Sequence, residues 1–342
     1  MKADVPNQVW WGYVLLVLAA LLLPFLTGAT FGSGWVRTLD FVLLYAMLAL
    51  GLNIVVGYAG LLDLGYIAFY ALGAYLYALL ASPHLGLHWS PFVILPLGAA
   101  VTALFGILLG APTLRLRGDY LAIVTLGFGE IVRLFMNNLD RPFNLTNGPQ
   151  GINLIDPLFA VQPFQFLGLR ITSVYFYYYL FLLLAGVIIF VSIRLQDSRI
   201  GRAWMAIRED EMAAKACGIN TRNIKLLAFA MGASFGGVAG GLFAGFQGFI
   251  SPESFVLLES IMVLCMVVLG GMGNIVGVIL GAALLTITPE IFRDLAVPLQ
   301  NTLLGRTVID PENLRMLLFG ITLVVTMLFK PQGLWPARFG SR

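Results

Sequence analysis

Long apolar segments recur along most of this chain, separated by short stretches rich in polar, glycine and proline residues. A transmembrane helix needs about 20 mostly apolar residues to cross the hydrocarbon core of a bilayer. By that measure the pattern predicts ten spans, at residues 11–27, 38–57, 61–81, 91–110, 119–138, 174–194, 225–247, 257–271, 274–289 and 314–330. We therefore expect an all-α polytopic membrane protein of about ten transmembrane helices, with residues 1–342 forming a single transmembrane domain.

Two regions of this pattern allow more than one interpretation. The segments 257–271 and 274–289 are short, and the glycines between them permit either one broken helix or a re-entrant pair. The first segment, 11–27, has the position of a signal peptide. Trp10 and Trp11 at its edge favour a retained membrane anchor, because tryptophan prefers the membrane interface.

Composition supports a membrane location. Hydrophobic residues make up 59% of the chain and charged residues only 11%, whereas an average soluble protein has roughly 25% charged residues. So few charges cannot form a water-facing surface, so most of the surface must contact lipid. The net charge of +3 is small, and no nucleic-acid partner is expected.

Cysteine and histidine content gives no indication of a metal site or another cofactor. Cys217 and Cys265 have no metal-ligand spacing, and a disulfide between them is not expected. His84 and His88 are four residues apart, which would suit a metal on a helix, but the proline and glycine between 82 and 87 predict a loop there.

The basic residues orient the chain through the positive-inside rule. With an even number of spans, both termini lie on the same side of the membrane. If that side is the cytoplasm, thirteen of the 20 Lys and Arg residues lie on or beside the cytoplasmic face, and the segment 194–225 alone holds seven of them. This predicts an inner-membrane protein with cytoplasmic termini, a cytoplasmic loop at 195–224 and a periplasmic loop at 139–173.

The cytoplasmic loop contains the signals of a short helix over 211–217. Asp210 is a favoured N-cap residue, and Gly218 suits the left-handed conformation that ends a helix. Glu211 and Lys215 are four residues apart and can form an ion pair. A two-turn helix is marginal in water on its own, so we expect it to pack against another surface. A solvated amphipathic loop is the alternative.

Glycines at a spacing of four mark the seventh span. Two adjacent stripes on that helix would be free of side chains, which permits close approach of neighbouring backbones. Helices that slide against each other and simple tight packing both fit this pattern. The stripes consist of Gly232, Gly236 and Gly240, and of Gly237, Gly241 and Gly245.

A few polar residues fall inside or beside the spans, where polar groups are costly and commonly functional. Glu130 and Arg133 are three residues apart and can pair on one helix face. They are either part of a pathway that attracts a zwitterionic substrate or a self-neutralised structural pair. Asn53 is a further pathway or structural candidate, and Asp63 is expected to cap the third span.

Within the periplasmic loop, residues 145–152 have the turn dipeptides Asn-Gly and Gly-Pro. One hypothesis is that Asn147 and Gln150 dock a partner protein on that side of the membrane. An ordinary constrained turn is the equally weighted alternative.

The chain has no P-loop, since that motif needs Gly-Lys followed by Ser or Thr. Its lysines are Lys2, Lys215, Lys225 and Lys330, and none follows a glycine. Any ATP hydrolysis that drives this protein must therefore come from another polypeptide.

Several motifs together resemble the branched-chain amino-acid permease family of ABC importers, and its larger subunit type in particular. Glu211, Ala213, Ala214 and Gly218 match the Glu-Ala-Ala…Gly motif of the cytoplasmic coupling loop, although Met212 is inserted after the acid. The other blocks, within a resemblance that covers residues 38–335, are 51–65, 125–133, 145–152, 201–208 and 331–334.

The resemblance implies a transport subunit without its own catalysis, similar in fold to the many-span (type II) importers such as the cobalamin permeases. It also implies two cytoplasmic ATP-binding subunits, a second permease subunit, a periplasmic substrate-binding protein and an amino-acid substrate. Asn147 and Gln150 are then the candidate docking residues for the binding protein. The residues expected to couple to the ATPases are Arg208, Glu209, Asp210, Glu211, Ala213, Ala214, Lys215 and Gly218.

Other functions remain open at this point. Permeases for urea or short amides have similar sequences. A stand-alone secondary transporter would normally use intramembrane acids as ion relays, and here such acids are few. A membrane-embedded enzyme is disfavoured, because the sequence has no Ser-His, His-rich or paired-carboxylate constellation.

Overall fold

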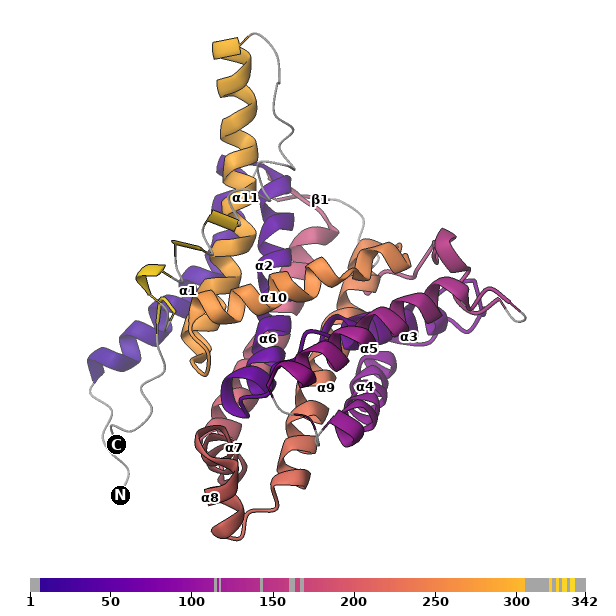
Figure 1. The fold of residues 1–342 in the computed structure, drawn as a ribbon. Coiled ribbons are helices and arrows are strands. Elements are labelled where there is room, and N and C mark those ends of the chain that lie inside the picture. The colour runs from indigo at the N-terminus through magenta and orange to yellow at the C-terminus, as the bar shows by residue number, and fades with distance from the viewer. Residues whose placement is uncertain are drawn as a thin grey trace.

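The computed structural model describes residues 7–304 except 114, 115, 117, 142, 143, 160–163, 167 and 168, together with positions 320, 321, 324, 325, 328–330 and 333–335. This part of the chain is almost entirely helical (Figure 1). The helices are α1 (Asn7–Thr30), α2 (Ser33–Leu52), α3 (Ile67–Leu80), α4 (Pro91–Thr113), α5 (Asp119–Asn138), α6 (Ser173–Asp197), α7 (Arg199–Glu209), α8 (Glu211–Ala216), α9 (Thr221–Gln247), α10 (Leu257–Gly270) and α11 (Ile275–Leu304).

Shorter elements complete the described fold. A π-helix, η1 (Asn53–Tyr58), continues α2, and two 3-10 turns, η2 (Gly148–Gln150) and η3 (Pro252–Phe255), precede other elements. Strands β1 (Phe164–Phe166) and β2 (Leu169–Ile171) form an antiparallel hairpin in which Phe164 pairs with Ile171.

Six helical segments among the described residues are long and apolar enough to cross a membrane, so the all-α polytopic prediction is confirmed. They are Ser33–Tyr58, Pro91–Thr113, Ser173–Asp197, Thr221–Gln247, Pro252–Gly270 and Ile275–Asp294. Helices α1 and α5 occupy the predicted positions 11–27 and 119–138. Most of the tenth predicted span, 314–330, lies outside the described residues.

The third predicted span, 61–81, is wrong in its first part. Helix α3 begins only at Ile67, and residues 59–66 run as non-helical chain. Gly60 has a φ of +67°, a left-handed conformation that suits glycine. The predicted third span is therefore discontinuous: the non-helical residues 59–66 lead into α3, which is a shorter apolar helix.

Neighbouring elements bind the backbone of this non-helical segment. The Leu64 N–H donates to Oγ1 of Thr125 on α5 at 3.0 Å, and Ser260 on α10 donates to the Leu64 carbonyl at 2.6 Å. Asp63 accepts from the Gly65 N–H at 2.9 Å. Asp63 thus forms a turn ahead of α3 and is not its N-cap, which is Tyr66. Irregular backbone at membrane depth is tolerated only where protein or water satisfies it in this way.

Two separate helices occupy the region of the eighth and ninth predicted spans. Gly271 (φ +117°) and Gly273 (φ +88°) turn the chain between α10 and α11, and the two helices pack against each other. At the closest point, Gly270 and Gly277 have no room for a Cβ atom. The region is therefore a packed helix pair and not one broken helix.

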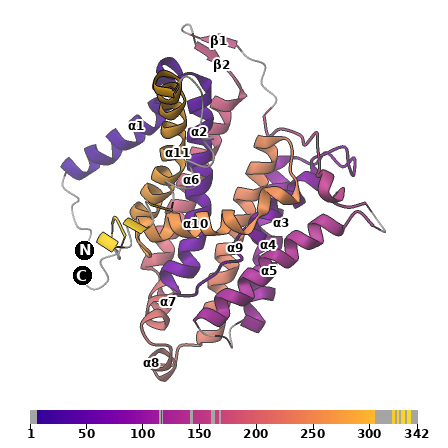
Figure 2. The same cartoon turned by 45° about the horizontal axis from the view of Figure 1, so that its top comes forward.

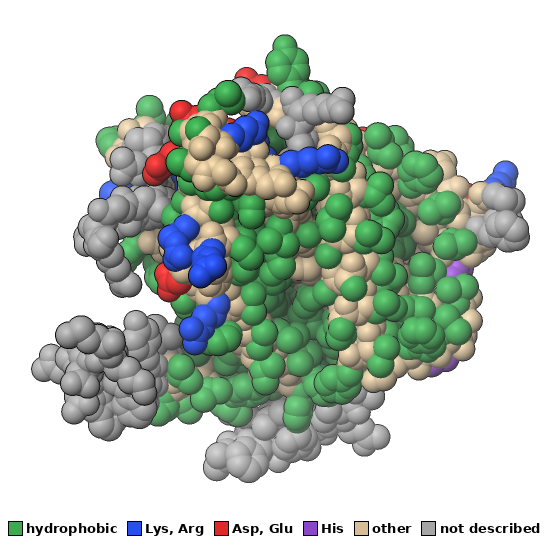
Figure 3. Space-filling view, turned by 90° about the horizontal axis from the view of Figure 1, so that it is seen from below, with side chains coloured by type: hydrophobic (Ala, Val, Ile, Leu, Met, Phe, Trp, Pro, Cys, Tyr) green, Lys and Arg blue, Asp and Glu red, His purple; other side chains and the backbone are tan. Residues whose placement is uncertain are grey.

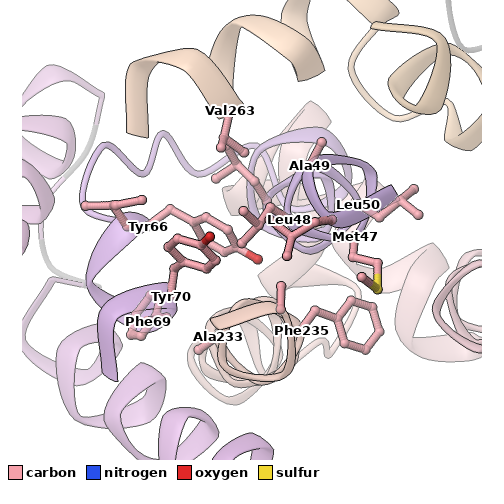
Figure 4. Packing of buried hydrophobic residues seen from close by; sticks show 14 of the residues in the cluster. Met47, Leu48, Ala49, Leu50, Tyr66, Phe69, Tyr70, Ala233, Phe235 and Val263 are labelled. Carbon is pink, nitrogen blue, oxygen red and sulfur yellow. The ribbon is translucent and has the colours of Figure 1, made fainter. Parts of the chain in front are cut away.

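The core is centred on α9, which packs most extensively against α3 and α4 and also contacts α2. Figure 4 shows Tyr66, the N-cap of α3, with Phe69 and Tyr70 of α3 beside Ala233 and Phe235 of α9 and residues 47–50 of α2. These side chains are buried, as expected for a helix that contacts protein on most of its circumference.

The two hydrophilic segments lie at opposite ends of the molecule, with the β1–β2 hairpin at one end and α8 at the other (Figure 2). The segment predicted as a cytoplasmic loop, 195–224, is more structured than expected. It contains all of α7 in addition to the predicted short helix, so the two helices form a hairpin with a sharp turn at Asp210.

Candidate functional site

Helix α8 begins with the cap that the sequence predicts. Asp210 has an extended backbone, and its Oδ1 accepts hydrogen bonds from the N–H groups of Met212 at 2.7 Å and Ala213 at 3.1 Å. The helix ends at Ala216, and Gly218 follows in the left-handed region with a φ of +84°. The predicted helix 211–217 is therefore confirmed to within one residue.

Glu211 is the electrostatic centre of this short helix. Its carboxylate pairs with Lys215 at 3.1 Å, as the spacing predicts, and with Lys225 at the start of α9 at 2.8 Å. The Lys225 side chain is only 7% exposed and that of Glu211 21%. The second pair was not predicted, because Lys225 belongs by hydropathy to the seventh span. It fixes α8 to the end of a membrane helix.

This environment shifts the acidity of Glu211. Burial alone raises the pKa of the carboxyl, but the hydrogen bonds and charges of Lys225 and Lys215 outweigh burial and lower the pKa to about 2. A carboxyl whose pKa is lowered in the folded protein contributes stability above its ordinary pKa of about 4.5. That contribution disappears as the pH falls towards 2.

We therefore predict a specific pH dependence for a Glu211→Gln variant. The difference in melting temperature between wild type and variant should be constant from pH 7 to pH 5, shrink below about pH 4.5 and vanish near pH 2. Thermal unfolding of the detergent-purified protein across this range measures it. A difference that grows as the pH falls would contradict the assignment.

A second prediction concerns the cap. Asp210→Ala removes the acceptor for two helix N–H groups and should destabilise α8 by about 1 kcal/mol. Hydrogen–deuterium exchange should then accelerate at Met212 and Ala213. Asp210→Ser preserves a capping oxygen and is the matched control, expected to exchange like wild type. Equal exchange in all three proteins would show that the cap has no role.

Helix α7 packs the α7–α8 hairpin against α6, α9 and η1. Trp204 is fully buried, and its indole N–H donates to the Ile224 carbonyl at 2.7 Å, at the start of α9. Ser198 caps the helix by accepting from the Gly201 N–H at 3.1 Å. The signal for this helix was present in the apolar spacing of Ile200, Trp204 and Ile207, which places all three on one face.

Two of the expected coupling residues stand at the end of α7 and point to different surroundings. Glu209 is exposed. Arg208 is also exposed, but its Nη1 donates a hydrogen bond to the buried Gly57 carbonyl of η1. Of the remaining expected residues, Ala213 and Lys215 are exposed and Ala214 is buried. Figure 3 views this end of the molecule and shows basic side chains gathered on one part of a largely apolar face.

The predicted glycine stripes on α9 both face protein. A Cβ atom at Gly240 would collide with the Tyr70 carbonyl of α3, and one at Gly237 would collide with Thr102 of α4. The other four glycines are also confined, Gly236 least, since its nearest atom would be 3.2 Å from a Cβ. A Cβ at Gly232 would meet Val55, at Gly236 Tyr66, at Gly241 Leu95 and at Gly245 Leu158. These contacts establish close packing of α9 on both sides.

Glu130 and Arg133 form the predicted ion pair, at 2.5 Å. The structure adds a partner that the sequence analysis missed. Arg133 also contacts Glu253 of η3 at 3.2 Å, and Glu253 is 69% exposed. The cluster therefore has one positive and two negative charges and joins α5 to η3 at a partly exposed position.

Asn53 forms a buried hydrogen bond between two elements of the fold. It is buried, and its Oδ1 accepts a hydrogen bond from the Gly273 N–H at 2.8 Å, in the turn between α10 and α11. This links the π-helix to the α10–α11 pair.

Asn147 and Gln150 lie on the η2 turn. Asn147 adopts a left-handed conformation (φ +58°), and its Nδ2 donates to the Gly151 carbonyl at 2.9 Å. Gln150 is exposed. The loop is held on the body by a backbone pairing between Ile152 and Ile250.

The two histidines lie in a loop, as predicted, and contact different groups. His84 Nε2 lies 2.9 Å from the Asn144 carbonyl, and His88 Nδ1 lies 2.5 Å from Oδ2 of Asp156. Among the described residues, no three His, Cys, Asp or Glu side chains gather as metal ligands.

Most of the chain matches a known protein family. The family described as "Branched-chain amino acid transport system / permease component" matches residues 34–327. The chain is 43% identical to the high-affinity branched-chain amino acid transport system permease protein LivM of Escherichia coli (strain K12), over 94% of this chain and 74% of that protein.

Two further relatives are more distant. A probable LivM of Methanocaldococcus jannaschii is 29% identical over 72% of this chain and 69% of its own length. The permease protein LivH of Escherichia coli (strain K12) is 27% identical over 71% of this chain and 80% of its own length. No solved structure matches the chain, so the expected likeness to the cobalamin permeases stays a prediction.

Proposed function

Because the chain belongs to the branched-chain amino acid transport system permease family, we propose that it carries leucine, isoleucine and valine across the inner membrane as one subunit of an ATP-driven importer. The similarity to LivM extends over nearly the whole chain. The observation that carries the proposal is α8. It is a capped, charged helix at one end of the molecule, tied by Glu211 to Lys225 at the start of a membrane helix.

The partners we propose are two cytoplasmic ATP-binding subunits, a second permease subunit and a periplasmic binding protein. The ATPases would dock on the exposed surface of α8, since this chain has no P-loop of its own. The similarity to LivH, itself a branched-chain amino acid permease, supports a related second subunit.

The membrane orientation we propose places α7 and α8 in the cytoplasm, together with both termini. The basic residues of 194–225 support this through the positive-inside rule. The opposite end then faces the periplasm. There we propose that the η2 turn, with Asn147 and Gln150, docks the binding protein. Gln150→Ala should lower ATP hydrolysis stimulated by the binding protein, and unchanged stimulation would remove the idea.

For the translocation path we propose the surface where Glu130 and Arg133 of α5 meet Glu253 of η3. A partly exposed charge cluster on a predicted span is costly against lipid and acceptable against water or another subunit. The excess negative charge suits the ammonium group of an amino acid. A structural pair remains the competing role, supported by the 2.5 Å contact within one helix.

Substrate competition in a reconstituted importer tests the substrate assignment. Proteoliposomes containing both permeases and the ATPases, with binding protein and ATP, should accumulate labelled leucine. Excess isoleucine or valine should suppress this uptake, and urea or acetamide should not. Suppression by urea or acetamide alone would favour the related amide permeases.

A further inference from the structure

Arg208 connects the end of α7 to the point where the third span is interrupted. Its guanidinium donates to the Gly57 carbonyl, in the last turn of the π-helix η1. Carbonyls at the end of a helix lack donors from a following turn and bind cations well. Arginine therefore provides a charge-assisted hydrogen bond at a site where the helix cannot provide one.

The stem of the same side chain contacts Gly60. A Cβ atom built on Gly60 would lie 2.8 Å from Cγ and 3.2 Å from Cβ of Arg208. The Arg208 side chain and the Gly60 backbone are thus in direct contact, and a side chain at position 60 would collide with Arg208. Gly60 is the second residue of the non-helical segment and has a φ of +67°, so Arg208 contacts this segment close to its start.

A second contact fixes the same two elements. Tyr58 of η1 stacks on Trp204 of α7, with ring centroids 6.5 Å apart and an interplanar angle of 12°. Both side chains are fully buried. A displacement of α7 must therefore move the end of η1 or break this contact, because packed aromatic surfaces leave little free volume.

From Gly60 the chain runs to two further helices. Gly65 lies against the Thr125 carbonyl of α5, where a Cβ atom would collide with it. Tyr66 donates its hydroxyl to the Gly232 carbonyl of α9 at 3.0 Å. The segment 59–66 therefore joins α7 at one end to α5 and α9 at the other. Such a short non-helical connection can change its backbone angles more readily than a helix.

We propose that Arg208 is a positioning residue that transmits movement of the α7–α8 hairpin into the discontinuous third span, and that it is not a docking contact for the ATPases. This rests on the proposed function, since the movement comes from ATP-binding subunits on α8. The Glu211–Lys225 ion pair connects α8 to α9. The contacts of Arg208 with Gly57 and Gly60 are a second connection, from α7 to the segment before α3.

The test uses the complete importer with Arg208→Ala and Arg208→Lys. Three quantities are measured: co-purification of the ATPases, ATP hydrolysis with binding protein, and leucine taken up per ATP hydrolysed. Arg208→Ala should retain the ATPases and hydrolyse ATP, but uptake per ATP should fall about tenfold or more, within the usual range of coupling between sites. Arg208→Lys retains a cationic donor and should recover part of the ratio.

Arg202→Ala is the matched control. Arg202 lies on the same helix, is exposed like Arg208 and also donates to a backbone carbonyl, but its acceptor is Asp197 at 2.8 Å, at the end of α6 and not in η1. Its removal should leave uptake per ATP unchanged. If Arg208→Ala does not accumulate in the membrane, Arg208→Gln replaces it. Its shorter, uncharged side chain retains part of the stem against Gly60 but not the charge-assisted hydrogen bond, so a fall in the ratio is again expected.

The outcomes separate this inference from the proposed function. A wild-type ratio of uptake to hydrolysis in Arg208→Ala or Arg208→Gln overturns the role of Arg208. Loss of the ATPases from these variants also overturns it, because Arg208 would then be a docking residue. Failure of the wild-type importer to show any ATP-dependent uptake instead removes the proposed function itself.

Discussion

Replacement of Glu211 by lysine is expected to abolish ATP-driven uptake. The substitution removes the partner of Lys225, which is only 7% exposed, and brings a third positive charge beside Lys215 and Lys225. Removing one partner of a fully buried ion pair costs about 3–5 kcal/mol. The cost is lower here because Glu211 is 21% exposed, but a six-residue helix is marginal by itself and depends on such contacts. Helix α8 should detach from α9, and the ATPases should no longer co-purify with the permease.

A charge swap provides the control for this prediction. Glu211→Lys combined with Lys225→Glu restores one opposite pair and should recover part of the assembly, because residues in direct contact couple in double-mutant cycles. Asp197→Lys, an exposed acid at the end of α6, should leave assembly intact. Normal assembly and uptake in the single Glu211→Lys variant would overturn the role given to α8.

Substitution of Gly240 by alanine is expected to prevent correct folding. A single methyl group there would collide with the Tyr70 carbonyl and lie 2.8 Å from the Ala74 N atom. These are backbone atoms of α3, so no side chain can rotate away, and α9 and α3 must separate. Overpacking of this kind costs typically about 1–3 kcal/mol and occasionally more. Gly240→Ala should give little monodisperse protein on size-exclusion chromatography in detergent.

Gly186→Ala is the matched control, since Gly186 is exposed on α6 and a Cβ atom there meets nothing within 4 Å. It should behave like wild type, or slightly better, because alanine is the stronger helix former. Equal yield and melting temperature for Gly240→Ala would show that α9 does not depend on the close contact with α3.

Hydropathy predicted the membrane helices well, because crossing lipid constrains every residue of a span in the same direction. It failed at the third span for a physical reason. Leu61, Leu62 and Leu64 are as apolar as helical residues, but the segment is surrounded by protein, where backbone groups find partners on other helices. Gly60 and Gly65 were the available signals, and hydropathy gives glycine little weight.

The coupling region shows the same division between local and long-range information. The cap at Asp210, the Glu211–Lys215 pair and the left-handed Gly218 all follow from spacings of a few residues, and the structure has all of them. The contacts of Glu211 with Lys225 and of Arg208 with Gly57 join residues 14 and 151 positions apart. Local spacing carries no information about such pairs.

The most direct test of the central claim is uptake by the purified chain with and without its partners. Liposomes containing this chain alone should take up no leucine, even under imposed proton or sodium gradients, because the work comes from outside the polypeptide. Addition of the second permease, the ATPases, the binding protein and ATP should start uptake. Gradient-driven uptake by the chain alone would contradict the account and identify a secondary transporter.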